Sequence, residues 1–97
     1  MEKYEIDIKE LKKKQANNAK IIDVRSLQEY NERHIKGAIN IPYYDMNKNI
    51  QNKLVDKNQE IVLYCSYGGR SKTAYNRLKS LGYNNVYCLY RGIDFWI

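Results

Sequence analysis

Short runs of apolar residues recur along the chain, each bounded by polar or turn-forming residues. Runs of this length are typical of strands buried in a sheet. Residues 19–24 and 61–64 are rich in apolar residues, so we expect them to be covered on both faces, as strands of a parallel sheet are. Pro42 cannot donate a ladder hydrogen bond, which places its run at a sheet edge. The runs predict strands over residues 4–6, 19–24, 37–42, 61–64 and 86–89.

The segments between these runs carry helical spacing or signals for a helix start. Asp7 followed by Glu10 has the spacing of a capping box, in which side chains and backbone at the helix start bond to one another. Ser26 followed by Glu29 has the same spacing. Apolar residues four positions apart predict an α-helix over residues 45–54. The expected helices cover residues 8–17, 27–30, 45–54, 71–81 and 92–97.

Strands that alternate with helices predict an α/β fold with a mostly parallel sheet. The chain has 97 residues and no visible linker or repeat, so residues 1–97 are expected to form a single domain. Ligands of such sheets bind beyond the carboxyl ends of the strands. Asp23 and Arg25 lie at the end of one predicted strand and Cys65 follows another. We therefore expect these three residues at the same edge of the sheet.

The segment of residues 61–71 carries the strongest chemical signal. A buried strand leads directly to Cys65, and a loop with Gly68 and Gly69 then leads to Arg70 and a helix that begins at Ser71. A glycine-containing turn between a strand and a helix start surrounds the loop with backbone N–H groups and the positive end of the helix. A cysteine in that position is expected to favour the nucleophilic thiolate.

Charge and hydropathy exclude some other functions. The net charge is +6, from 17 lysines and arginines against 11 aspartates and glutamates. A nucleic-acid binder would also show a recognisable binding motif, and none is present. The lysines are therefore interpreted as solvated helix faces with a weak general attraction for anionic substrates.

No apolar run is long enough to span a membrane. Residues 1–5 lack the layout of a secretory signal, so a cytoplasmic location is expected, although a removed signal peptide would leave no trace.

The chain has two cysteines and one histidine, too few for a disulfide framework or a typical zinc site. Cys88 lies within an apolar run, which indicates a buried structural thiol. Cys65 lies at a strand end instead. His34 is expected to make a structural hydrogen bond. No metal and no organic cofactor is expected.

Together, three stretches resemble the rhodanese-like sulfurtransferase family. The resemblance implies a three-layer α/β/α fold whose five-stranded parallel sheet has the strand order 3-2-4-5-1. In that order the second and fourth strands are neighbours, which would bring Asp23 and Arg25 near the loop after Cys65. The stretches follow one another in family order over nearly the whole chain: residues 21–25 followed by Glu29 and Tyr30, residues 34–42, and residues 64–71 with the closing residues 92–96.

The resemblance also implies a reaction and a set of site residues. Cys65 would take a sulfane sulfur from a small anionic donor such as thiosulfate, becoming a persulfide, and pass it to a thiol, cyanide or protein acceptor. The backbone of the following loop would hold the charge of the terminal sulfur, and Arg70 would fold over the loop or pair with the donor. Asp23 and Arg25 would support the site. The substrate-binding residues expected from the resemblance are Ser66, Tyr67, Gly68, Gly69, Arg70 and Ser71.

Two other functions remain open at this point. Phosphatases and arsenate reductases of the same fold carry a Cys-x5-Arg loop, whereas Cys65 and Arg70 are separated by four residues, which suits one sulfur atom better than a phosphate. The loop also lacks an acidic residue to protonate a phosphate leaving group. The other alternative is a non-catalytic or sulfur-carrier module that binds a partner. The presence of Cys65 favours catalysis or sulfur carriage over binding alone.

One residue departs from the family pattern. Many relatives have two glycines before the last helix, and here Arg91 precedes Gly92. The substitution places a positive side chain near the expected active-site face. It favours an anionic donor, binds a partner or has no role, and the sequence does not distinguish these.

Overall fold

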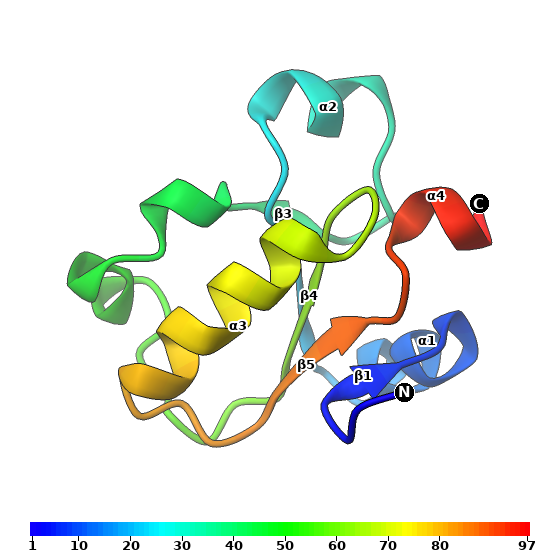
Figure 1. The fold of residues 1–97 in the computed structure, drawn as a ribbon. Coiled ribbons are helices and arrows are strands. Elements are labelled where there is room, and N and C mark those ends of the chain that lie inside the picture. Colours follow the sequence, from blue (N-terminus) through cyan, green and yellow to red (C-terminus); the bar gives the residue numbers. More distant parts are fainter.

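All 97 residues are described by the computed structural model of the chain. Its centre is a parallel sheet of five strands in the order β1-β5-β4-β2-β3. This is the predicted order 3-2-4-5-1 read from the opposite edge, so the predicted topology is confirmed. Figure 1 shows the sheet with helices packed around it. The strands are β1 (Glu5–Ile6), β2 (Lys20–Asp23), β3 (Ile39–Asn40), β4 (Ile61–Tyr64) and β5 (Val86–Leu89).

Buried side chains on the two faces of the sheet form two separate cores. Successive residues of β4 alternate between them, because Leu63 belongs to one core and Val62 to the other. The Leu63 core is completed by Leu78 of α3. The Val62 core is completed by Leu11 of α1 and by the α4 helix. The α-helices are α1 (Ile8–Ala16), α2 (Leu27–Glu32), α3 (Gly69–Ser80) and α4 (Ile93–Trp96).

The α-helix predicted over residues 45–54 is wrong. The segment instead contains two 3-10 turns, η1 (Tyr43–Asp45) and η2 (Lys48–Asn52). Asn47 lies between them in an extended conformation, and its side chain accepts a hydrogen bond from the N–H of Asn49. The apolar residues that suggested a helix, Met46 and Ile50, are buried against the sheet. Their spacing therefore reflects burial of an irregular segment, since two tight turns can point residues four apart into the same core.

The two predicted capping boxes differ in the structure. Ser26 and Glu29 form the complete motif at the start of α2. Asp7 accepts a hydrogen bond of 2.7 Å from the N–H of Glu10, but the Glu10 side chain does not bond back. Both helices nevertheless start where the pattern predicted them.

Three other predicted boundaries shift by a few residues. The α3 helix starts at Gly69 rather than Ser71, and the predicted strands at residues 4–6 and 37–42 shorten to two residues each. Both short strands, β1 and β3, lie at sheet edges, where only one side of the strand is paired. None of the helices combines the length and the apolar character that crossing a bilayer requires.

Candidate active site

Cys65 follows the last residue of β4, at the carboxyl end of the central strand. Its side chain is buried, with only 1% of the residue exposed. The Sγ atom accepts hydrogen bonds from two backbone N–H groups, that of Gly68 at 3.0 Å and that of Ser71 at 3.4 Å. Donors aimed at one sulfur from a loop and from the first turn of α3 stabilise negative charge on that sulfur. The predicted arrangement of Cys65 beside loop amides is therefore present.

Gly68 gives the loop its shape. It has a left-handed backbone with φ +107°, a region that is costly for residues with a Cβ atom. This conformation turns its N–H group toward the sulfur. Gly69, which the sequence suggested for the same purpose, lies in α3, and a Cβ atom added there would meet no other atom within 4 Å. Only the first glycine of the pair is needed for the turn.

The α4 helix holds the same loop from the other side. The N–H of Ile93 donates to the carbonyl of Cys65 at 2.8 Å, and that of Asp94 donates to the carbonyl of Ser66 at 3.2 Å. Gly92 makes this approach possible, because a Cβ atom at that position would lie 2.3 Å from the carbonyl oxygen of Ser66. The loop is thus fixed by backbone contacts to a helix close to it in space but distant in sequence.

Arg70 forms an ion pair with Glu29 of α2. Its Nη1 and Nη2 atoms donate to the two carboxylate oxygens of Glu29 at 2.7 and 3.0 Å. These hydrogen bonds hold the pKa of the Glu29 carboxyl at about 2. The same carboxylate accepts a weaker hydrogen bond of 3.4 Å from the hydroxyl of Ser66. Sequence reasoning treated Glu29 only as a helix cap and missed this contact, for which no local pattern gives a signal.

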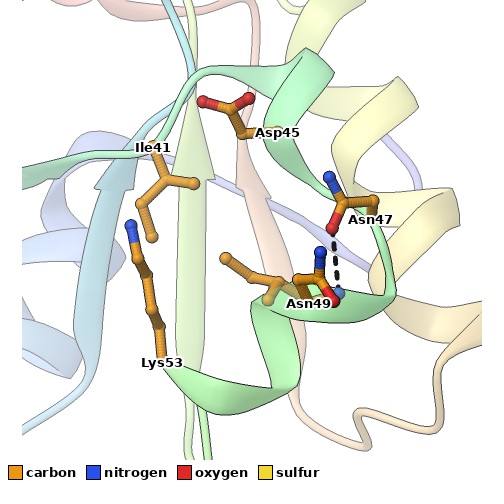
Figure 2. Close-up of a pocket in the computed structure, with 6 residues that line it drawn as sticks. Ile41, Asp45, Asn47, Asn49 and Lys53 are labelled. Carbon is orange, nitrogen blue, oxygen red and sulfur yellow. Dashed lines mark hydrogen bonds between the residues drawn. The ribbon is translucent and has the colours of Figure 1, made fainter.

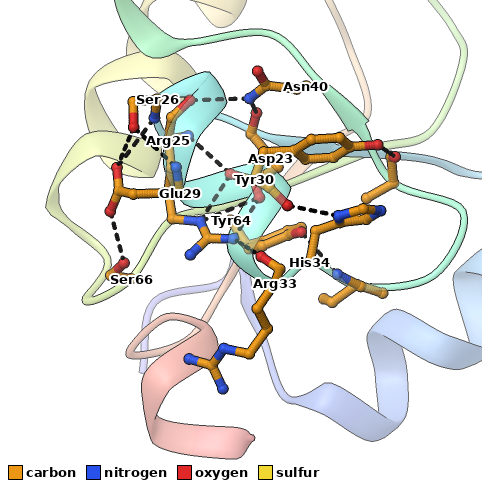
Figure 3. Close-up of polar contacts among 12 residues, drawn as sticks. Asp23, Arg25, Ser26, Glu29, Tyr30, Arg33, His34, Asn40, Tyr64 and Ser66 are labelled. Atoms are coloured by element: carbon orange, nitrogen blue, oxygen red, sulfur yellow. Dashed lines mark hydrogen bonds and ion pairs between the residues drawn. The ribbon is translucent and has the colours of Figure 1, made fainter.

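Asp23 and Arg25 form a buried ion pair beside the loop (Figure 3). The Nη2 atom of Arg25 lies 2.7 Å from Oδ2 of Asp23, and its Nε donates to Oδ1 at 3.0 Å. The side chain of Asn40 ties both residues to β3 by donating to their carbonyl oxygens at 3.0 Å. Arg25 and Ser66 line one cavity of about 420 Å³. The pair is thus near the Cys65 loop as expected, and its hydrogen bonds run within the scaffold.

The side chains of Tyr64 and His34 also make hydrogen bonds near the Asp23–Arg25 pair. The hydroxyl of Tyr64 accepts a hydrogen bond of 3.0 Å from the N–H of Ile35, and burial raises the pKa of Tyr64. His34 stacks on Tyr30 with ring centroids 3.8 Å apart, and its Nδ1 lies 2.7 Å from the Tyr30 carbonyl. These contacts match the structural hydrogen bond expected for His34.

The second cysteine differs chemically from the first. Cys88 lies in β5, 3% exposed, and its Sγ donates to the carbonyl of Ser71 at 3.4 Å. Burial raises the pKa of Cys88 to about 12. A thiol with that pKa remains protonated near neutral pH, so Cys88 is a packing residue.

Of two further surface cavities, one borders the Cys65 loop and the other lies apart from it. One of about 370 Å³ borders the loop and is lined by Tyr67, Arg91, Asp94 and Phe95. Tyr67 is 80% exposed at the tip of the loop. The other, shown in Figure 2, has a volume of about 160 Å³ and is lined by residues of the η1–η2 segment and Ile41. No residue of the Cys65 loop lines it, so it is not part of the candidate site.

Comparisons with known proteins agree with this geometry. Residues 7–97 match the family model of the rhodanese-like domain. The chain is 38% identical over 65 residues to thiosulfate sulfurtransferase PspE of Escherichia coli K12, covering 67% of this chain and 62% of that protein. It is 33% identical over 76 residues to the putative sulfur carrier protein YrkF of Bacillus subtilis 168, covering 78% of this chain and 40% of that protein.

A solved structure resembles the chain over almost its full length. It is the human single-domain sulfurtransferase TSTD1, which is 25% identical, has a TM-score of 0.82, and is matched over 98% of this chain and 96% of that one. The chain therefore belongs to the rhodanese-like domain family.

Proposed function

We propose that the chain, as one domain over residues 1–97, moves a sulfane sulfur from a donor such as thiosulfate to a thiol or cyanide acceptor through a persulfide on Cys65. The observation that carries this proposal is the pair of backbone N–H groups, from Gly68 and Ser71, directed at the Cys65 sulfur. The names of the relatives PspE and TSTD1 support a sulfurtransferase.

In the first half-reaction the Cys65 thiolate attacks the outer sulfur of the donor. A bond forms between Sγ and that sulfur, the sulfur–sulfur bond of thiosulfate breaks, and its electron pair leaves with sulfite. The thiolate is the reacting form of the cysteine, and the N–H groups of Gly68 and Ser71 are placed to stabilise its charge during this step. In the second half-reaction the acceptor attacks the terminal sulfur, and the electron pair of the persulfide bond returns to Cys65.

Between these steps the terminal persulfide sulfur carries a negative charge. We assign its stabilisation to the backbone of residues 66–71, in which the N–H groups of Gly68 and Ser71 donate to Cys65 Sγ. Such prearranged donors need no reorganisation when charge develops. Tyr67 is assigned to the entrance, since it is exposed at the loop tip, and Ser66, which is buried, is assigned to the lining of the cavity that it shares with Arg25. Asp23 and Arg25 are assigned a supporting role.

Arg70 distinguishes this proposal from a phosphatase. An arginine that clamps a phosphate must face the cysteine cradle, but both terminal nitrogens of Arg70 are taken by Glu29. The contact of Arg70 with Glu29 supports a role in holding the loop. The four-residue gap between Cys65 and Arg70 also leaves a smaller loop than the phosphatase pattern has.

The test is the intact mass of the purified protein after incubation with thiosulfate. We expect the gain of one sulfur atom at Cys65, which dithiothreitol removes. The Cys65→Ser variant should gain none, and the matched Cys88→Ser variant should gain sulfur as the unmodified chain does. Sulfur transfer to cyanide that persists in Cys65→Ser would overturn the proposal.

A sulfur-carrier role is the second candidate, favoured by the name of the relative YrkF. A carrier would form the same persulfide but would pass it poorly to cyanide and rapidly to a protein acceptor. Persulfide formation without appreciable thiocyanate production would favour the carrier over the enzyme.

A further inference from the structure

Arg33 connects the end of α2 to both ends of α4. Its Nη2 atom donates to Oδ1 of Asp94, in the first turn of α4, at 2.5 Å, and its Nη1 atom donates to the carbonyl of Ile97, just after the last turn, at 2.9 Å. One planar guanidinium therefore holds α4 at two points, which sets the orientation of the helix as well as its distance. In Figure 3 the Arg33 side chain extends from α2 toward this last helix.

The α4 helix depends on contacts with other elements because it is short. It contains four residues, Ile93–Trp96, far fewer than an isolated helix needs to be stable in water. Its N-cap residue, Gly92, supplies no side-chain hydrogen bond. The indole of Trp96 donates to the carbonyl of Tyr90 at 2.7 Å, but both residues belong to the same end of the chain. The contact with Arg33 links the helix to α2.

The surface between α2 and α4 is polar. A cavity of about 420 Å³ lies there, and both Arg33 and Asp94 line it together with Ser66 of the Cys65 loop. No apolar side chain lines this cavity. The two helices are therefore joined across it by hydrogen bonds and the ion pair of Arg33 with Asp94 rather than by apolar packing.

The helix that Arg33 holds is the one that holds the Cys65 loop. Two backbone N–H groups of α4 donate to the carbonyls of Cys65 and Ser66, and one of them belongs to Asp94. A shift of α4 would move these carbonyls. It would also move the N–H groups of Gly68 and Ser71 away from the sulfur that they are directed at.

Arg33 is itself anchored in the scaffold. Its carbonyl accepts a hydrogen bond from Nη2 of Arg25, whose guanidinium is buried against Asp23. Hydrogen bonds thus run from the carboxyl end of β2 through Arg33 to α4. Glu29, one turn earlier in α2, pairs with Arg70 at the start of α3. The α2 helix therefore contacts the elements on both sides of the loop.

We propose that Arg33 is a positioning residue for sulfur transfer, which clamps α4 so that the amides of the Cys65 loop stay directed at the reacting sulfur. The inference rests on the sulfur-transfer function proposed above. Both terminal nitrogens of Arg33 are engaged within the protein, so the side chain acts through α4 rather than on the donor. Donors arranged in advance stabilise developing charge only while they keep their positions, so the clamp contributes to the rate.

The test changes charges of opposite sign at the two ends of the ion pair. Arg33→Met removes a positive charge, Asp94→Ala removes a negative one, and both break the clamp. In single-turnover mass measurements at saturating thiosulfate, we expect both to slow sulfur uptake by Cys65 roughly fivefold. The thiosulfate concentration for half the maximal rate should change little. The double variant should be no slower than Arg33→Met alone, because both changes remove the same interaction.

A lysine separates clamping from charge. Arg33→Lys keeps the positive charge but lacks the planar fork that reaches both Asp94 and Ile97, so it should recover only part of the rate. Arg77→Gln removes an exposed arginine charge from α3 and, as the matched control, should change nothing. A faster reaction in Asp94→Ala, or full activity in Arg33→Lys, would show that Arg33 acts by attracting the anionic donor and would overturn the clamp.

Hydrogen exchange decides the clamp independently of turnover. The amides of Ile93 and Asp94 should exchange about fivefold faster in Arg33→Met, as measured by NMR, while those of β4 stay unchanged. The urea midpoint should move little, because the ion pair is partly exposed. Unchanged exchange in α4 would contradict the clamp. If no donor sulfurates Cys65 but exchange in α4 still depends on Arg33, the sulfur transfer is wrong and the clamp on α4 stands.

Discussion

The carboxylate of Glu29 accepts hydrogen bonds from both terminal nitrogens of Arg70, at 2.7 and 3.0 Å. This contact joins α2 to the first turn of α3. The two residues are 41 positions apart. A guanidinium paired with a carboxylate through two parallel hydrogen bonds is fixed in orientation as well as in distance. The Cys65 loop leads directly into α3, and its Ser66 hydroxyl also donates to Glu29, so the pair holds the loop from the α2 side.

Replacing Glu29 by glutamine should slow sulfur transfer. The amide cannot accept both guanidinium hydrogen bonds, so Arg70 and the loop lose their fixed position, and we expect kcat/KM for thiosulfate to fall roughly tenfold. Glu32→Gln is the matched control, because Glu32 lies on the same helix, is exposed, and its side chain makes no hydrogen bond or ion pair. Activity that rises in Glu29→Gln would instead indicate that Glu29 withholds Arg70 from the donor.

The same pair should make stability depend on pH in the acid range. The ordinary pKa of Glu29 is 4.5, and Arg70 lowers it to about 2 in the folded chain. Since the folded state binds this proton more weakly than the unfolded state, the stabilisation is full above pH 4.5 and disappears as the pH falls toward 2. The difference in melting temperature between the unmodified chain and Glu29→Gln should therefore shrink over that interval. A difference that stays constant down to pH 2 contradicts the assignment.

Two glycines near the site should respond oppositely to alanine. Gly92→Ala would place a Cβ atom 2.3 Å from the Ser66 carbonyl oxygen, at a residue with φ +80°. We expect a loss of about 3 kcal/mol or more in the free energy of unfolding, together with lost activity as α4 moves away from the loop. Gly69→Ala meets no atom and lies in a helix, so it should stabilise the fold by about 0.5 kcal/mol. Urea unfolding of both variants tests the contrast.

Removing Asp23 should be costly for the fold. Asp23→Asn would leave the guanidinium of Arg25, which is 4% exposed, without its carboxylate. Breaking a buried pair on one side typically costs about 3–5 kcal/mol. Chemical unfolding of Asp23→Asn measures this loss. The exposed pair Arg33–Asp94 offers a comparison, because Asp94→Asn should cost less than about 1 kcal/mol.

The two cysteines should differ in reactivity. Because burial raises the pKa of Cys88 to about 12, iodoacetamide should leave it unmodified in the folded protein near pH 8 and modify it only after denaturation. Peptide mapping after a timed reaction would show this. Rapid native labelling of Cys88 would sink the interpretation of that residue as structural.

Much of this molecule can be read from local signals. The apolar runs locate all five strands. For β2 and β4 the reason is that a strand buried on both faces needs apolar residues in succession. The Ser26–Glu29 box locates the start of α2, because its hydrogen bonds span only three residues. The family motifs supply the sheet order and point to Cys65. The prediction over residues 45–54 fails where burial and helical spacing give the same pattern.

The tertiary structure decides what surrounds the cysteine. Nothing near Arg70 in the sequence selects Glu29 as its partner, and nothing near Cys65 shows that α4 holds the following loop. Parallel strands need long connections, so residues at the carboxyl edge of the sheet come from distant segments and meet only after the strands pair. The sequence by itself therefore determined the five strands and the starts of α1 and α2, and its motifs supplied the strand order and pointed to Cys65 as the proposed nucleophile. The packing of those elements decided which side chains and which backbone groups hold the loop.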